Sequence, residues 1–122
     1  MSEITILNLP YPISTNKYWR HYNHHVVLSN EARNYKKMVK LQNLKIKPRK
    51  TPLKVIVILH PKLSKRNDTF KKVLDIDNSL KCVLDSLNEV AYEDDAQIKK
   101  LNVEYGEAKE NGGVTVYISD VK

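Results

Sequence analysis

The sequence predicts a single α/β (α+β) domain in which two main helices pack on a small mixed β-sheet. Runs of apolar, β-branched residues are separated by two segments whose apolar residues recur at helical spacing. The 122 residues are enough for one modest core and not for two, so one domain over residues 1–122 is expected. Hydrophobic residues make up 41% of the chain and charged residues 29%, which is typical of a folded globular domain.

The first half of the chain predicts three strands and one helix. Residues 4–9 form a short strand that ends at Pro10, and an irregular loop follows up to residue 16. Residues 26–28 form a second short strand, after which Ser29 is the N-cap of a helix over residues 30–43. Residues 53–60 are rich in β-branched residues and apolar on both faces, and therefore predict an interior strand.

The second half predicts a helix followed by a β-hairpin. Asn78 is a good N-cap, and the helix that it begins would bury one apolar face. That face consists of Leu80, Val83, Leu84, Leu87 and Val90. Residues 98–105 and 114–118 both alternate between apolar and polar side chains, with an Asn-Gly-Gly turn between them. A C-terminal hairpin is expected from this pattern.

The charge balance points to a polyanionic partner. Lys and Arg number 21 against 14 Asp and Glu, which favours nucleic acid first and an acidic membrane surface second, although a generally basic protein would have the same balance. No signal-peptide pattern and no apolar segment of about 20 residues is present, so a cytoplasmic protein without membrane association is expected. The single cysteine, Cys82, rules out an intrachain disulfide and a cysteine-based zinc site, and is expected to be buried.

Two segments mix or concentrate cations in a way that suits nucleic-acid binding. Residues 17–25 combine cations with aromatic rings, which could grip a phosphate backbone and stack on bases. The alternative is that Tyr18 and Trp19 cover the core. The loop over residues 61–72 is cationic and leads directly to a group of acids, so it could hold a polyanion beside them. The candidate DNA-contacting residues are Asn16, Lys17, Tyr18, Arg20, Lys65, Arg66, Lys71 and Lys72.

The acids after this loop predict a divalent-cation site. Asp75 and Asp77 are two residues apart, so both side chains would project to the same side of an extended segment. Asp95 would come from the acidic turn after the helix, with Asp94 as a candidate fourth ligand. Carboxylate oxygens are the ligands that Mg²⁺ prefers, and Mg²⁺ can supply the nucleophile and charge relief that phosphodiester hydrolysis needs.

Helical spacing adds a cation to these acids. Asp77, Lys81 and Asp85 are four residues apart and would lie along one side of the helix. Lys81 could then neutralise the scissile phosphate, and Asp85 could orient Lys81 or a water molecule. The alternative is that Asp75 and Asp77 are turn residues, that Lys81 and Asp85 form a surface ion pair, and that the acidic turn is solvated.

These motifs resemble the RusA family of Holliday-junction resolvases. The resemblance lies in Asp75-x-Asp77-Asn78-x-x-Lys81, Asp85-x-Leu87, Asp94-Asp95-Ala96-Gln97 and, more loosely, Leu9-Pro10-x-Pro12-x-Ser14-x-Asn16 with Tyr18 and Arg20. It implies that Asp75, Asp77 and Asp95 match the essential metal-binding acids and that Lys81 matches the essential basic residue. The chain departs from the family pattern at residues 61–74, where the loop is longer and less rich in arginine.

The resemblance further implies a crossover junction endodeoxyribonuclease of phage or prophage recombination and repair. Such an enzyme requires Mg²⁺, with Mn²⁺ as a substitute, needs no organic cofactor, and cuts four-way DNA junctions symmetrically as a homodimer. A junction is close to twofold symmetric, so two chains with one site each would match it. The alternatives are a non-catalytic basic nucleic-acid-binding module and a metal-dependent nuclease for other branched DNA or RNA.

Overall fold

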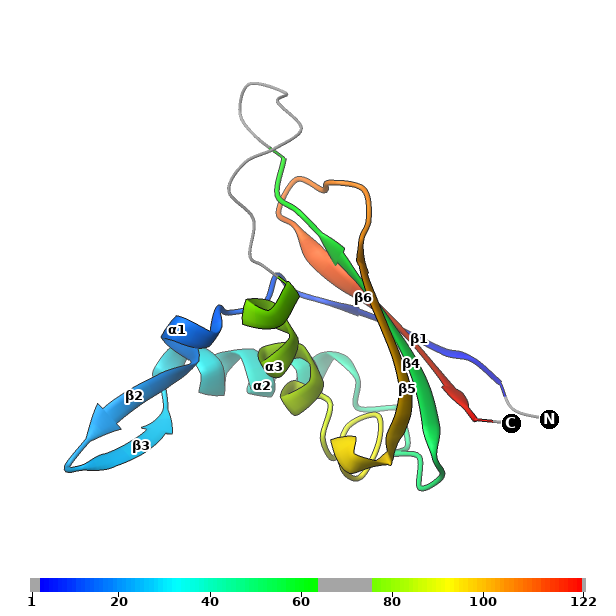
Figure 1. Cartoon of the computed structure of the whole chain (residues 1–122), viewed down its shortest axis with the longest axis horizontal. Coiled ribbons are helices and arrows are strands. Elements are labelled where there is room, and N and C mark those ends of the chain that lie inside the picture. Colours follow the sequence, from blue (N-terminus) through cyan, green and yellow to red (C-terminus); the bar gives the residue numbers. More distant parts are fainter. Residues whose placement is uncertain (1–2, 64–75, 122) are drawn as a thin grey trace.

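The computed structural model describes residues 3–63 and 76–121 of the chain (Figure 1). Its main sheet has four strands in the order β1–β6–β4–β5. Their bounds are Thr5–Leu9 for β1, Leu53–His60 for β4, Ile98–Tyr105 for β5 and Gly113–Asp120 for β6. The helices are α1 (Thr15–Tyr18), α2 (Asn30–Gln42), α3 (Ile76–Ser86) and the short 3₁₀ helix η1 (Asp95–Gln97). A separate two-stranded sheet pairs β2 (Trp19–Tyr22) with β3 (His25–Leu28).

The four-stranded sheet is mixed, as predicted, and β4 is interior. β4 pairs with β6 in antiparallel and with β5 in parallel orientation, and β1 pairs with β6 at the other edge. The prediction of a C-terminal hairpin is wrong, because β4 lies between β5 and β6. The segment between these two strands instead pairs with the end of β4, through Gly106 N donating to Leu59 O and Lys109 N donating to Pro61 O. Alternation and turn residues predicted both strands but not their partners.

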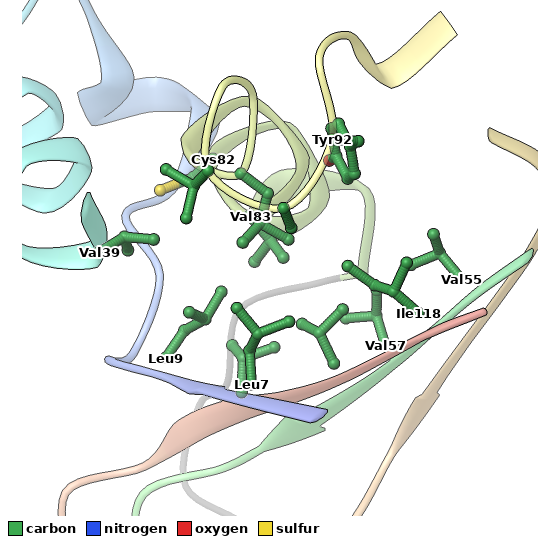
Figure 2. Packing of buried hydrophobic residues seen from close by; sticks show 14 of the residues in the cluster. Leu7, Leu9, Val39, Val55, Val57, Cys82, Val83, Tyr92 and Ile118 are labelled. Carbon is green, nitrogen blue, oxygen red and sulfur yellow. The ribbon is translucent and has the colours of Figure 1, made fainter. Parts of the chain in front are cut away.

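The helices cover one face of the sheet, and the core lies between the two layers (Figure 1). Figure 2 shows Val83 of α3 pointing toward Leu7 and Val57 of the sheet. The fully buried aliphatic residues of the sheet come from alternate positions, as the period of a strand requires. They are Leu7, Leu53, Val55, Val57, Val114, Val116 and Ile118.

Helix α2 forms as predicted, whereas α3 differs from the expectation in its start and its buried face. Ser29 caps α2, since its Oγ accepts a hydrogen bond from Ala32 N at 3.1 Å. α3 begins at Ile76, so Asn78 lies inside the helix and is not its N-cap. Its buried residues are Ser79, Cys82, Val83 and Ser86, while Leu80 and Leu84 are only partly buried. The two serine hydroxyls donate to carbonyls one turn back, which lets small polar residues sit in the interface.

Two elements near the N-terminus were not predicted. Residues 15–18 form α1, although only residues 15 and 16 were expected to belong to the irregular loop and residues 17 and 18 to the cationic, aromatic segment. Residues 19–22 form β2. The β2–β3 turn is made by Asn23 and His24, whose φ angles of 46° and 66° give the left-handed pair that two-residue hairpins favour. The turn contains no glycine, so its sequence gave no clear indication of a hairpin. Figure 1 shows this hairpin projecting from the rest of the domain.

The burial of Cys82 predicts an unreactive thiol. Its side chain is 1% exposed, and burial raises the pKa of the thiol to about 11 despite a hydrogen bond from Ile13 N. We therefore expect iodoacetamide at about pH 8 to leave the native protein unmodified, because the thiolate is the reactive form. Mass spectrometry should show full alkylation in denaturant, and rapid alkylation of the native protein would contradict the buried position.

Among the described residues, no helix is both long and apolar enough to cross a membrane.

Candidate active site

Helix α3 presents Asp77 and Lys81 on one side, as the spacing predicted. Asp77 lies in the first turn and Lys81 one turn later, and both side chains are exposed. The backbone at Asp77 is helical and not extended, so the argument that Asp75 and Asp77 project from one extended segment does not hold for Asp77. Asp75 lies outside the described residues. An acid in the first turn is also favoured by the positive end of the helix dipole.

The acidic turn is held in place by side-chain hydrogen bonds. Asp94 is the N-cap of η1, and Gln97 Oε1 accepts from Asp94 N at 2.9 Å, which completes a capping box. Asp95 N donates to Asn88 Oδ1 at 2.9 Å, and this bond ties η1 to the segment after α3. The backbone at Asp95 therefore has a fixed position, although the sequence predicted only a turn here. Asn88 was not among the predicted site residues.

The surroundings of Asp95 suit a cation. Burial raises the pKa of Asp95, and the hydrogen bond and negative charge of Asp94 raise it further, while the charge of Lys81 acts in the opposite direction. Two adjacent carboxylates in a partly desolvated position repel each other, and a divalent cation would relieve that repulsion. Both groups are hard oxygen donors of the kind that Mg²⁺ takes. The chemistry of the donors thus fits the predicted metal.

The described residues do not by themselves complete a metal site. Nowhere in residues 3–63 and 76–121 do three His, Cys, Asp or Glu side chains come close enough together to hold an ion. Asp94 and Asp95 are neighbours in the acidic turn, which Asn88 ties to the segment after the C-terminal end of α3. Asp77, in contrast, lies in the first turn of α3. The predicted ligand set also includes Asp75, for which the structure gives no position.

Asp85 is the centre of a hydrogen-bonded cluster that joins the helices. It accepts from the hydroxyl of Tyr18, from Lys36 Nζ at 3.3 Å and from Asn88 Nδ2 at 3.2 Å. Partial burial opposes its ionisation, but the bonds from Tyr18 and Lys36 and the charges of Lys36 and Lys81 hold the pKa of Asp85 below its ordinary value. Asp85 therefore has a structural role that was not predicted. The charge of Lys81 also acts on it, and the expectation that Asp85 orients Lys81 or a water molecule stays a prediction. We call Asp85, Tyr18, Lys36 and Asn88 the Asp85 cluster.

Because Asn88 belongs to this cluster and also bonds Asp95, the cluster joins α1, α2 and α3 to the acidic turn. Sequence reasoning missed Lys36 and Asn88. Asn88 lies three residues after Asp85, a spacing that allows a contact at the end of a helix but does not single one out.

The residues predicted to contact DNA from the N-terminal segment divide into two groups. Asn16, Lys17 and Arg20 are exposed. Tyr18 is 0% exposed and donates to Asp85, so its ring belongs to the core and is not offered to a base; this corrects the prediction for Tyr18. Trp19, in contrast, is 40% exposed. The candidates in the cationic loop, which are Lys65, Arg66, Lys71 and Lys72, lie outside the described residues.

Comparisons with known proteins agree on one family. The family model described as "Endodeoxyribonuclease RusA" matches residues 10–119. The "Crossover junction endodeoxyribonuclease rusA" of Enterobacteria phage HK97 is 32% identical to this chain over 118 residues, which are 93% of this chain and 92% of that protein. Both matches extend across α3 and the acidic turn, where the candidate site lies.

Proposed function

Since this chain belongs to the RusA family of endodeoxyribonucleases, we propose that it resolves Holliday (four-way) DNA junctions in recombination and repair of phage type. Hydrolysis of phosphodiester bonds is the chemistry of the family. The finer proposal is that the enzyme depends on Mg²⁺ and makes paired, symmetric nicks. The observation that carries the proposal of junction resolution is the likeness, over nearly the whole chain, to a phage protein named as a crossover junction nuclease.

We assign the metal to the predicted acids. Asp75, Asp77 and Asp95 would hold Mg²⁺, with Asp94 beside Asp95, and the bound ion would supply Lewis acidity and an activated water molecule. The raised pKa of Asp95, caused first by burial and then by Asp94, supports a site that is completed by a cation. Asn88 holds the backbone of Asp95 in place.

The protein's own cations would act on the DNA. Lys81 is exposed on the same side of α3 as Asp77, so its ammonium group can neutralise charge that develops on the scissile phosphate. Asn16, Lys17 and Arg20, with the cations of the 61–72 loop, would contact the phosphate backbone and position the junction. These contacts offset the repulsion between DNA and the acids.

The symmetry of the proposed substrate supports a homodimer. Each chain carries one set of candidate ligands, and resolution without gaps requires two cuts related by the twofold axis of the junction. We propose that two chains act together, one on each of two opposed strands.

Junction cleavage is the direct test. The purified protein should be incubated with synthetic four-way junctions, flaps and plain duplex in Mg²⁺, Ca²⁺ or EDTA. We expect paired symmetric nicks at the junction in Mg²⁺, none in EDTA and none with Asp75→Asn. Equal cutting of plain duplex would contradict junction resolution, and preferred cutting of flaps or RNA would indicate another target. Salt-sensitive binding without any metal-dependent product would indicate a binding module.

A further inference from the structure

Trp19 lies against Lys81, the cation that the proposed function places beside the scissile phosphate. Lys81 Nζ is 5.9 Å from the centroid of the Trp19 ring. An ammonium group is attracted to the face of an aromatic ring within about 6 Å of its centroid, and indole is the best of the aromatic side chains for this contact. We propose that Trp19 is a positioning residue, whose ring holds the Lys81 ammonium group in place on the active side of α3. This inference rests on the proposed function.

The indole ring is itself held from a second direction. Trp19 and Tyr18 make an edge-to-face contact with ring centroids 5.1 Å apart and an interplanar angle of 83°. Tyr18 is fully buried, and its hydroxyl donates to Asp85, which lies one turn after Lys81 on α3. The ring and the lysine are thus both fixed to the same helix, one through Tyr18 and the other through its own backbone. This arrangement sets where the ring sits relative to Lys81.

An aromatic restraint suits a cation that has to meet a phosphate. The ion pairs among the described residues join Lys36 to Asp85 and Arg49 to Asp120, and neither involves Lys81. A carboxylate partner would neutralise the lysine and would have to be displaced by the substrate. A ring restricts the long, flexible side chain while leaving its full positive charge. Lys81 is also close enough to Asp95 and Asp85 to interact with both through its charge, so its position matters to the acids.

Fluorescence tests the contact without any substrate. Trp19 is the only tryptophan in the chain, so intrinsic emission reports on this ring alone. We expect Lys81→Met to shift the emission wavelength of the DNA-free protein, because a charge is removed from beside the indole. The matched variant Lys37→Met, on the exposed side of α2, should leave the emission unchanged. Unchanged emission in Lys81→Met would overturn the proposal whether or not the protein cuts DNA.

Single-turnover cleavage tests the consequence. At saturating protein, Trp19→Leu should slow the cutting of a four-way junction about fivefold, the effect expected for losing one exposed cation–π contact. Junction affinity should change little, and Trp19→Phe, which keeps a ring, should recover most of the rate. Val26→Ala is the control, because Val26 is an exposed residue of β3 in the same hairpin and is not among the candidate DNA contacts.

The outcomes separate this inference from the proposed function. An unchanged cleavage rate in Trp19→Leu, with normal cutting by the unaltered chain, would overturn the positioning role and leave the function intact. Equal slowing by Trp19→Leu and Val26→Ala would also overturn it, since the effect would then belong to the hairpin as a whole. If the unaltered chain cuts no junction, the proposed function fails, and the emission of Lys81→Met still decides whether the ring holds the lysine. Thermal unfolding of each variant confirms that the domain is folded.

Discussion

Asp95→Asn should reduce junction cleavage by more than about a hundredfold, since the partners that merely orient a metal ligand are already worth about ten- to a hundredfold. The substitution keeps the size of the side chain and leaves the backbone bond from Asp95 N to Asn88 in place. It removes one of the two adjacent carboxylates that would hold the cation. The rate should be measured under single-turnover conditions in Mg²⁺.

Asp95→Asn should lower the cleavage rate without lowering the thermal stability of the protein. The pKa of Asp95 is raised by burial and then by Asp94, so ionisation of Asp95 costs the folded state free energy at neutral pH. A neutral amide avoids that cost, and we expect the thermal midpoint of metal-free Asp95→Asn to equal or exceed that of the unaltered protein. Glu93→Gln, an exposed change in the same turn, is the control and should retain cleavage. Normal cutting by Asp95→Asn would contradict the assignment of this ligand.

The parts of the fold that the sequence predicted are those governed by local rules. Ser29 before a run of helical spacing determines where α2 begins, because a serine oxygen satisfies a free N–H of the first turn. The β-branched, apolar stretch of β4 favours an interior strand, and β4 lies between β5 and β6. Neither inference needs knowledge of a distant contact.

The features that the sequence did not predict depend on contacts between residues far apart in the chain. β5 alternates like a hairpin strand, but its parallel pairing with β4 is set by how the whole sheet assembles. Tyr18 lies in a basic, aromatic segment whose sequence allowed either contact with DNA or a place in the core. Its burial and its hydrogen bond to Asp85, far along the chain, decide for the core. For the candidate site, helical spacing placed Asp77 and Lys81 on one side of α3. It could not show that the Asp85 carboxylate accepts hydrogen bonds from Tyr18, Lys36 and Asn88.

The Asp85 cluster should contribute strongly to stability, and Asp85→Ala is expected to lower the free energy of unfolding by about 3 kcal/mol. The bond from Tyr18 dominates this value, since removing its acceptor leaves a hydroxyl on a fully buried residue without that partner. The ion pair with Lys36 is partly exposed and adds little, because such pairs are worth about 0–1 kcal/mol. Urea unfolding of the metal-free protein measures the change.

Two single variants and the pH dependence test whether Tyr18 contributes more than Lys36 to the stability that Asp85 supplies. Tyr18→Phe should cost about 1–2 kcal/mol and Lys36→Met less than about 1 kcal/mol. In double-mutant cycles, Tyr18 should show the larger coupling to Asp85.

The stability that Asp85 supplies should depend on pH. Desolvation opposes its ionisation, but the bonds from Tyr18 and Lys36 outweigh this effect and hold the pKa of Asp85 below its ordinary value. The stabilisation by Asp85 is therefore present above the pKa of the unfolded state, about 3.9, and is lost as pH falls through the pKa of the folded state. The unaltered protein should therefore lose stability more steeply than Asp85→Asn as pH falls below about 4. Parallel pH profiles would contradict an ionised Asp85 at the centre of the cluster, and with it the link from Tyr18 to the acidic turn.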